Sequence, residues 1–341
     1  MKRQQVTINH VASRAGVSIK TVSRVFNDEP NVRSSTREKV LEAARELNYW
    51  PNLSARRLAS NRSFVIALLY DNPQSDYVAD IQAGALKQCR ADGYNLLIHP
   101  CQTQSPQLAD DILRLYRQST VDGLILTPPV SDLEPLLDRL TEDNLDFVRV
   151  SQRPTLSESP CVAVDDEEAA FKMTQHLLSL GHRKIGFIMG HPDHGASHDR
   201  LVGFRAAMRK AGIEHPDHLF AQGLFTFDSG RSCAQRLLGL RERPTAIFAS
   251  NDHMAMGALV AAHECKIEVP TELSVCGFDD SSMALYAWPP LTTVRQPVVE
   301  VAALAAQLLL RQLSQQPVTP ILHRLKSRLM IRQSTGPLAV H

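Results

Sequence analysis

Apolar positions recur at two different spacings along the chain and divide it into a short head and a long body. In residues 1–62 apolar side chains repeat every three or four positions, the period of an amphipathic helix. From residue 63 onward short apolar runs, beginning with FVIALLY at 64–70, alternate with helical segments. Such alternation is typical of parallel sheets covered by helices. The pattern predicts an all-α head followed by an α/β body.

The head pattern predicts two short helices joined by a tight turn. Thr7 can cap the first helix, and Gly16 can end it in a left-handed conformation. Ser18 can cap the second helix. A helix, a Gly-containing turn and a second helix form a helix-turn-helix, whose second helix enters the major groove of DNA. The inward positions of the two helices are Ile8, Val11, Ala12, Ala15, Val22, Val25 and Phe26.

A third helix is predicted from Ser35 onward. Ser35 and Glu38 have the spacing of a capping box, and Pro51 ends the helix. Its inward positions are Val40, Leu41, Ala44 and Leu47.

Charge is unevenly distributed between the head and the body. Residues 1–62 contain twelve Lys and Arg against five Asp and Glu, whereas residues 63–341 contain 25 against 31. A basic head is the electrostatic footprint expected of nucleic-acid binding, although a solvated basic face without a partner has the same composition. Charge leaves both alternatives open, and the helix-turn-helix pattern favours DNA.

The apolar runs of the body form two sets. The first set is FVIALLY, NLLIHP, GLILTPP and FVRVS, and the second is CVAVD, KIGFIMG, AIFASND and LSVCGFDD. The second set restarts after the Ser- and Pro-rich stretch at 153–160, and two further strands follow late in the chain, in LTTVRQP and ILHRLKSRLMIRQS. The spacing predicts two doubly wound parallel-sheet subdomains.

Polar residues directly follow most of these strands. Ligands of open α/β sheets lie beyond the carboxyl ends of strands, so these side chains are candidate ligand contacts. Asp252 and Asp280 have another expected role, because each can cap the helix that follows it. The strand-end residues are Asp71, Asn72, Ser151, Asp165, Asn251, Asp252 and Asp279.

Motifs along the whole chain resemble those of LacI-family transcription regulators. The head resembles the family in TINHVASRAGVSIKTVSRVFN, VRSSTREKVLEAARELNYWPN and ARRLA. The body does so in DGLILTPP, LLSLGHRKIGFIMG, RLVGFRAAM, PTAIFASNDHMAMGAL, LSVCGFDD and PPLTTVRQP. The resemblance implies a DNA-binding domain at 1–50, a hinge helix or linker at 51–62, and an effector-binding and dimerisation domain at 63–341 that is similar to periplasmic sugar-binding proteins. It places one subdomain at about 63–161 and 295–322, and the other at about 162–294 and 323–341.

The same resemblance implies that the second helix reads operator DNA. Ile19, Lys20 and Arg24 would face base edges. Lysine and arginine can donate to guanine, and isoleucine suits a thymine methyl group. The implied phosphate-side contacts are Ser18, Thr21, Ser23, Asn27 and the region of Tyr49, with Thr7 as a further DNA-binding position.

Residues 52–60, NLSARRLAS, are too short and too charged to form a stable helix alone. By resemblance they are a hinge helix that orders when two copies pack in the minor groove. Asn52 would cap it, Ala55 would lie beside the groove, and Leu58 would be the apolar wedge that kinks the duplex. A linker with one incidental leucine is the alternative.

The resemblance also implies a small-molecule effector in the cleft between the subdomains. An arginine and carboxylates can bind adjacent hydroxyls bidentately, and an aromatic face can stack on a sugar ring. Ser151 stands where many relatives carry an acid, which leaves the effector's identity open. A sugar or glycoside is expected, and a purine or another metabolite is the alternative. The expected contacts are Asp71, Asn72, Tyr77, Ser151, Arg200, Phe225, Asn251, Asp279 and Gln296.

These features together predict a homodimeric repressor of a carbohydrate-utilisation operon that binds pseudo-palindromic double-stranded DNA, because one head reads only a half-site. The chain ends without a leucine heptad, so a tail-mediated tetramer is not expected. The N-terminal stretch MKRQQVTINH is polar and no apolar run reaches bilayer length, so we expect a cytoplasmic protein without a signal peptide or membrane span. No cofactor is expected.

Other functions fit the sequence less well. A periplasmic solute receptor would need a signal peptide and would lack the basic head. An enzyme is disfavoured because G-x-G-x-x-G after the first strand, the phosphate-binding G-x-x-x-x-G-K-[ST] loop and the G-x-S-x-G elbow are all missing. HPDHGASHD at 191–199 holds metal-ligand types, but a polar loop beside the cleft accounts for them. The six cysteines form no C-x-x-C pair and fit buried thiols.

Overall fold

The structure, a computed structural model, describes residues 6–26, 31–49, 62–72, 74–118, 121–151, 153, 157–214 and 216–338. The chain divides into two compact units, Met1–Ser63 and Phe64–His341. No helix in the described ranges is long and apolar enough to cross a bilayer.

The first unit contains the predicted helices α1 (Ile8–Ala15), α2 (Ile19–Phe26) and α3 (Ser34–Glu46). Gly16 ends α1 with a φ of 64°, and the backbone N–H of Thr21 donates to Ser18 Oγ over 3.1 Å at the start of α2. Both caps are therefore confirmed. The core between the three helices is formed mainly by Val11, Ala12, Val22, Val25, Val40, Ala43 and Ala44.

The capping box predicted at Ser35 is wrong. Helix α3 begins one residue earlier, at Ser34, and Arg33 occupies the N-cap position without a side-chain cap hydrogen bond. Ser35 therefore lies inside the first turn. The first backbone N–H groups of a helix have no carbonyl acceptor, and the side chain of the N-cap residue accepts from them instead. From inside the first turn the Ser35 hydroxyl is not in the N-cap position to do so.

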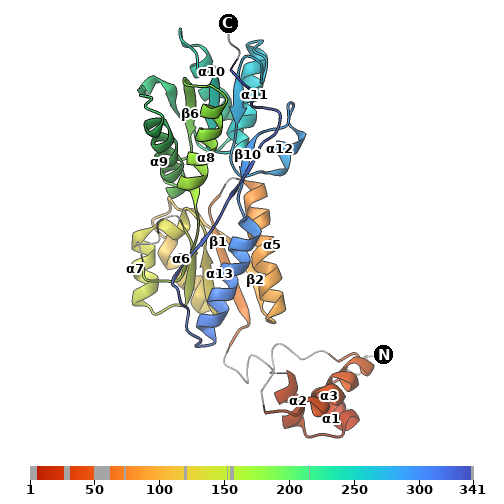
Figure 1. The fold of residues 1–341 in the computed structure, drawn as a ribbon. Coiled ribbons are helices and arrows are strands. Elements are labelled where there is room, and N and C mark those ends of the chain that lie inside the picture. Colours follow the sequence, from red (N-terminus) through yellow and green to blue (C-terminus); the bar gives the residue numbers. More distant parts are fainter. Residues whose placement is uncertain are drawn as a thin grey trace, which may run out of the picture. The chain divides into compact units, whose positions relative to one another are not determined.

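The second unit begins with a six-stranded parallel sheet in the order β11-β5-β4-β3-β1-β2. Its strands are β1 (Val65–Tyr70), β2 (Asn95–Pro100), β3 (Gly123–Leu126), β4 (Phe147–Val150), β5 (Cys161–Val164) and β11 (Leu322–Leu325). Helices α5 (Ser75–Ala91) and α13 (Val298–Leu313) pack side by side on one face (Figure 1). Helices α6 (Leu108–Gln118) and α7 (Glu134–Glu142) cover the other face, because alternate strand residues point to opposite sides.

A second, four-stranded parallel sheet has the order β7-β6-β8-β9. Its strands are β6 (Ile185–Met189), β7 (Phe220–Gln222), β8 (Ala246–Ala249) and β9 (Ser274–Cys276). Helices α8 (Asp166–Ser179) and α9 (Gly195–Lys210) cover one face, and α10 (Phe227–Leu238) and α11 (Asp252–Glu264) cover the other. Short elements η1 (Val130–Asp132), η3 (Asp217–Leu219) and α12 (Ser282–Tyr286) complete the unit.

One strand belongs to a different sheet than the sequence predicts. The run CVAV forms β5, which pairs with β4 and β11 in the first sheet rather than opening the second. Alternation of apolar runs cannot tell which sheet a strand joins, because a parallel strand looks the same in either. The subdomain boundary expected after residue 161 therefore falls inside a strand of the first sheet.

Three segments connect the two subdomains at their common waist (Figure 1). The chain crosses after β5, after β10 (Thr293–Arg295), and between β11 and β12 (Arg328–Met330). Strands β10 and β12 pair antiparallel as a small separate sheet. The second and third crossings are thus tied together on the side of the second subdomain.

Candidate functional site

Helix α2 presents a mixed apolar and basic face to solvent. Ile19 is 50% exposed with Lys20 and Arg24 exposed beside it, whereas Val22 and Val25 are buried on the opposite side. A single exposed isoleucine is common on protein surfaces, but one with two exposed cations on the same short helix suits contact with a DNA groove. The three side chains expected to face base edges are therefore all open to solvent.

The other expected DNA contacts lie around this helix. Ser18 Oγ and Thr21 Oγ1 are 2.9 Å apart at the start of α2. The ring of Tyr49 packs against Phe26 at the end of α2, with the two ring centroids 5.7 Å apart. Thr7 is exposed before α1, and Ser23 is half-buried on α2. Four expected contacts, Asn27, Asn52, Ala55 and Leu58, lie outside the described residues.

A pocket lies between the two subdomains of the second unit, at the carboxyl ends of their strands. Its open space is about 50 Å³. Six expected effector contacts line it: Asn72, Tyr77, Arg200, Phe225, Asp279 and Gln296. The structure therefore brings together side chains that are more than 200 positions apart in the sequence.

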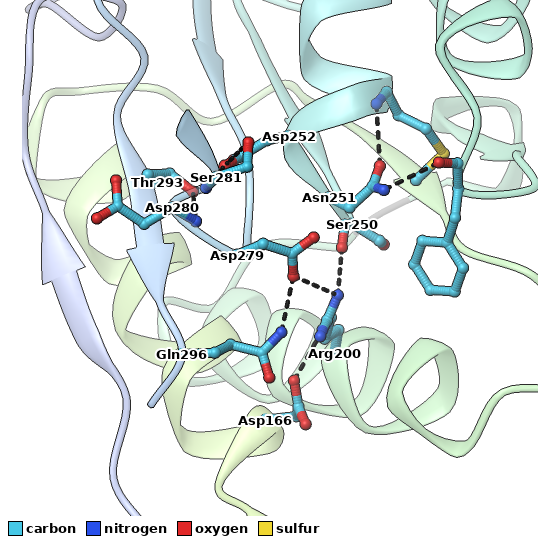
Figure 2. A network of polar contacts seen from close by, with 12 residues as sticks. Asp166, Arg200, Ser250, Asn251, Asp252, Asp279, Asp280, Ser281, Thr293 and Gln296 are labelled. Carbon is cyan, nitrogen blue, oxygen red and sulfur yellow. Dashed lines mark hydrogen bonds and ion pairs between the residues drawn. The ribbon is translucent and has the colours of Figure 1, made fainter. Parts of the chain in front are cut away.

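Arg200 is the centre of the polar network beside this pocket (Figure 2). Its Nε donates to Asp166 Oδ1 over 2.8 Å, and one terminal nitrogen lies 3.8 Å from Asp279 Oδ1. The guanidinium also lies 3.7 Å from the ring centroid of Phe278. Because Arg200 is only 4% exposed and held on several sides, its charge is fixed in position at the edge of the pocket.

Asp279 and Gln296 form a second polar pair in the pocket. Gln296 Nε2 donates to Asp279 Oδ1 over 2.7 Å. Asp279 has a φ of 114°, which is in the left-handed region that residues other than glycine rarely adopt. Such a conformation persists only where surrounding contacts hold it, and it is found most often at functional sites.

The network contains more carboxyl groups than cations. Burial raises the pKa of Asp279, and the attraction of Arg200 lowers it by a smaller amount. Together they leave the pKa raised to about 6. Burial also raises the pKa of Asp166, against the lowering effect of Arg200, and it raises the pKa of Asp252 well above its ordinary value. The region thus holds three buried carboxyl groups, of Asp166, Asp252 and Asp279, and one guanidinium, of Arg200. A further negative charge is disfavoured there.

Asp252 and Asp280 do not cap helices, contrary to the sequence prediction. Asn251 caps α11 instead, because its Oδ1 accepts from the backbone N–H of Met254 over 2.9 Å. The loop after β9 passes over the start of α11. Asp252 therefore accepts from Ser281, while Asp280 pairs with two arginines, Arg295 and Arg332.

Three expected effector contacts do not line the pocket. Asp71 accepts hydrogen bonds from the backbone and side chain of Thr103, over 2.8 and 2.7 Å. Ser151 is fully buried and its hydroxyl donates to Asp132. The third, Asn251, is the cap of α11 and also donates to a backbone carbonyl. Each of these side chains is engaged by the protein itself.

Four pocket-lining residues were not predicted from the sequence: Gln74, Pro128, His194 and Ala196. His194 lies in the histidine-rich stretch before α9, and its ring centroid is 5.4 Å from that of Phe225. Burial is the main cause that lowers its pKa to about 4, so the ring is neutral at pH 7. Within the described ranges, no three His, Cys, Asp or Glu side chains gather as metal ligands would.

Comparisons with known proteins agree with both parts of the chain. Residues 7–52 match the model of bacterial regulatory proteins of the lacI family, and residues 174–335 match a periplasmic binding protein-like domain. Catabolite control protein A of Priestia megaterium is 33% identical over 334 residues, which are 97% of this chain and 99% of that protein.

Two solved structures are similar over nearly the whole chain. The transcriptional regulator CelR–cellobiose complex has a TM-score of 0.74 at 30% identity, covering 97% of this chain and 100% of that one. The lac repressor dimer bound to operator and the anti-inducer ONPF has a TM-score of 0.79 at 28% identity, covering 98% and 100%. The family and the fold class expected from the sequence are confirmed, and the chain belongs to the LacI family of bacterial transcription regulators.

Proposed function

We propose that this regulator is a repressor that binds a pseudo-palindromic operator as a homodimer, and that a neutral sugar or glycoside in the pocket between the subdomains controls it. The observation that carries the effector proposal is the buried Arg200 network, which lies between two carboxyl groups and faces the ring of Phe225 at 5.9 Å. The related complex with cellobiose supports the same class of ligand.

The chemistry of the pocket favours a neutral polyhydroxylated ligand. Carboxylates accept from adjacent hydroxyls, a guanidinium donates to them, and an aromatic ring packs on the apolar face of a sugar. The excess of buried carboxyl groups argues against a phosphorylated or carboxylated ligand, because an added anion would have to overcome like-charge repulsion. A purine is the second candidate, since Tyr77 and Phe225 line the pocket from different subdomains and could both contact a flat ring.

The homodimer has support from apolar side chains exposed on the second unit. Leu285, Tyr286 and Trp288 are 57%, 85% and 92% exposed, all within or just after α12. Large apolar side chains gathered in this way mark interaction surfaces. Two copies related by a two-fold axis would present two α2 helices to two half-sites. The related lac repressor dimer bound to operator supports that arrangement.

Control of DNA binding would act through closure of the cleft. The pocket is lined from both subdomains, by Tyr77 on one side and Arg200 and Phe225 on the other, so a bound sugar contacts both. A sugar that binds one arrangement of the subdomains better than the other shifts the population toward it. Ser282 Oγ donates to Asp76 Oδ2 across the cleft over 3.3 Å, a contact that opening would break.

The test is a thermal-shift screen of neutral sugars, followed by operator binding with each hit. We expect a sugar to raise the Tm of the protein and to change its operator affinity by about 5- to 150-fold, the usual range of allosteric coupling. Asp279→Asn should abolish the sugar response, whereas the matched control Asp71→Asn, which changes a carboxylate outside the pocket, should keep it. A response to nucleobases alone would favour the second candidate.

A further inference from the structure

A second cavity, of about 210 Å³, lies at the waist where the subdomains join, between α8 and the β10–β12 pair. Its walls include residues of the first and third crossings, Asp165 and Lys326 with Ser327, and Val294 of β10, the strand that leads into the second crossing. A rotation of one subdomain against the other moves these crossings and therefore changes the shape of this cavity.

The interior of this hinge cavity combines an apolar floor with one unsatisfied polar atom. Ala169 and Val294 are buried in the core beneath it, and Leu329 packs against the same core. The hydroxyl oxygen of Ser327 is buried and has no hydrogen-bond partner among the described residues. A buried hydroxyl without a partner is unfavourable, so a ligand that accepted a hydrogen bond from it would gain on binding.

The rim of the cavity carries cations that the protein does not neutralise. Lys326 and Arg328 are exposed, and neither forms an ion pair within the described ranges. The other charged pair at the rim is self-contained, because Lys172 Nζ lies 3.0 Å from Glu168 Oε1. Asp165 is the remaining acid. Two cations therefore face one carboxylate here, the reverse of the balance in the pocket around Arg200.

We propose that the hinge cavity is a second ligand site, for a compact anion that carries a small apolar body, such as a phosphate monoester or a carboxylate. Lys326 and Arg328 bind the anionic group, Ser327 donates to it, and the floor of Val294 and Leu329 packs against the apolar body. Since the walls include the first and third crossings, the bound ligand stabilises one closure state and so changes operator affinity. This regulatory step rests on the proposed function, whereas binding itself does not.

Binding is tested by titration calorimetry of the full chain with phenyl phosphate, with benzoate, and with the neutral benzyl alcohol. We expect saturable binding of one anion per chain and no measurable binding of benzyl alcohol. Binding of phenyl phosphate alone identifies a phosphate site, and binding of benzoate alone a carboxylate site. Absence of binding by both anions, or equal binding of the alcohol, overturns the proposal.

Variants locate the bound anion. Combined Lys326→Gln and Arg328→Gln should weaken binding at least tenfold, while Arg209→Gln, an exposed arginine on α9, serves as the matched control and should leave it unchanged. Unchanged operator binding by the double variant without ligand shows that it folds. Gln296→Ala, which alters the other pocket and leaves Arg200 with its carboxyl partners in place, should keep anion binding. Loss of anion binding in Gln296→Ala, with unchanged urea unfolding, would place the anion in the other pocket and overturn the assignment.

The regulatory step has a separate readout. Operator affinity measured with and without saturating phenyl phosphate should differ by severalfold in the parent chain and not in the double variant. An anion that binds without changing operator affinity would refute regulation by the hinge cavity. A failure of every neutral sugar in the thermal-shift screen would instead contradict the proposed effector, so the two failures are distinguishable.

Discussion

The outer face of α2 and the pocket around Arg200 represent two opposite ways of building a binding site. The face of α2 comes from one eight-residue helix, and its candidate base contacts are exposed. The pocket comes from segments between Asn72 and Gln296, and its central charge is buried among carboxyl groups. Changes on the helix should therefore alter recognition with little effect on stability, whereas changes in the pocket should alter both.

The largest effect is expected from Arg200→Gln. Removing the guanidinium leaves Asp166 and Asp279 buried without their cation, and breaking a buried pair in this way costs about 3–5 kcal/mol. Urea unfolding of the body should show that loss, and a thermal-shift assay should show no sugar response. Adding Asp166→Asn should restore part of the stability, because it removes one unpaired charge. If the single variant is as stable as the parent, the network does not depend on this ion pair.

A smaller effect is expected from pH, through Asp279. Its pKa in the folded state is about 6, above the value of about 4 for an exposed aspartate, so the folded state binds the proton more tightly than the unfolded state. Below about pH 4 Asp279 is protonated and uncharged in both states. As pH rises from about 4 through 6 the unfolded state gives up the proton first, so the folded state loses stability over this range. Relative to Asp279→Asn, the parent should lose about 2–3 kcal/mol between pH 4 and pH 7.

The difference between the two chains is the quantity to measure, by urea unfolding at several pH values. Comparing two chains that differ at one residue cancels the opposite contribution of His194, whose lowered pKa destabilises the folded state as pH falls. A difference that stays constant from pH 4 to pH 7 would contradict the raised pKa.

On the helix, Arg24→Ala should change the recognition of operator bases. A bidentate contact between arginine and guanine contributes about 1–3 kcal/mol of discrimination against the wrong base. Selection from randomised operators should show relaxed preference at one position of each half-site. Equal weakening across all sequences would show instead that Arg24 only contacts phosphate.

The same contrast explains what the sequence could predict. The helices of the head and the outward position of Ile19, Lys20 and Arg24 follow from local periodicity, which needs no information about distant residues. The start of α3 was missed by one residue because several neighbouring side chains can begin a helix. The local pattern was therefore sufficient to predict which side of α2 faces solvent, but not to predict the N-cap residue of α3.

The pocket could be predicted only in part, because it depends on how separate segments meet. Arg200 and Asp279 were found through family motifs, whereas His194 and Gln74 lie in loops whose direction no periodicity describes. Asp71 also follows a strand, yet it binds Thr103 and lies outside the pocket. Strand-end position therefore identifies the correct edge of the sheet, but the contacts of each side chain depend on the neighbouring loop.

The smallest expected effect concerns Ile19, and it is the sharpest test of the exposed face. Half of this side chain is open to solvent, so Ile19→Ala should leave the stability of the head nearly unchanged. A contact with a thymine methyl group contributes about 0.8 kcal/mol, or roughly fourfold in operator affinity. Replacing individual thymines of the operator by deoxyuridine removes the same methyl group from the DNA. At one position, that replacement should weaken the parent roughly fourfold and Ile19→Ala hardly at all. Equal weakening of both proteins at every thymine would mean that Ile19 touches no methyl group, and that the outer face of α2 reads bases through its cations alone.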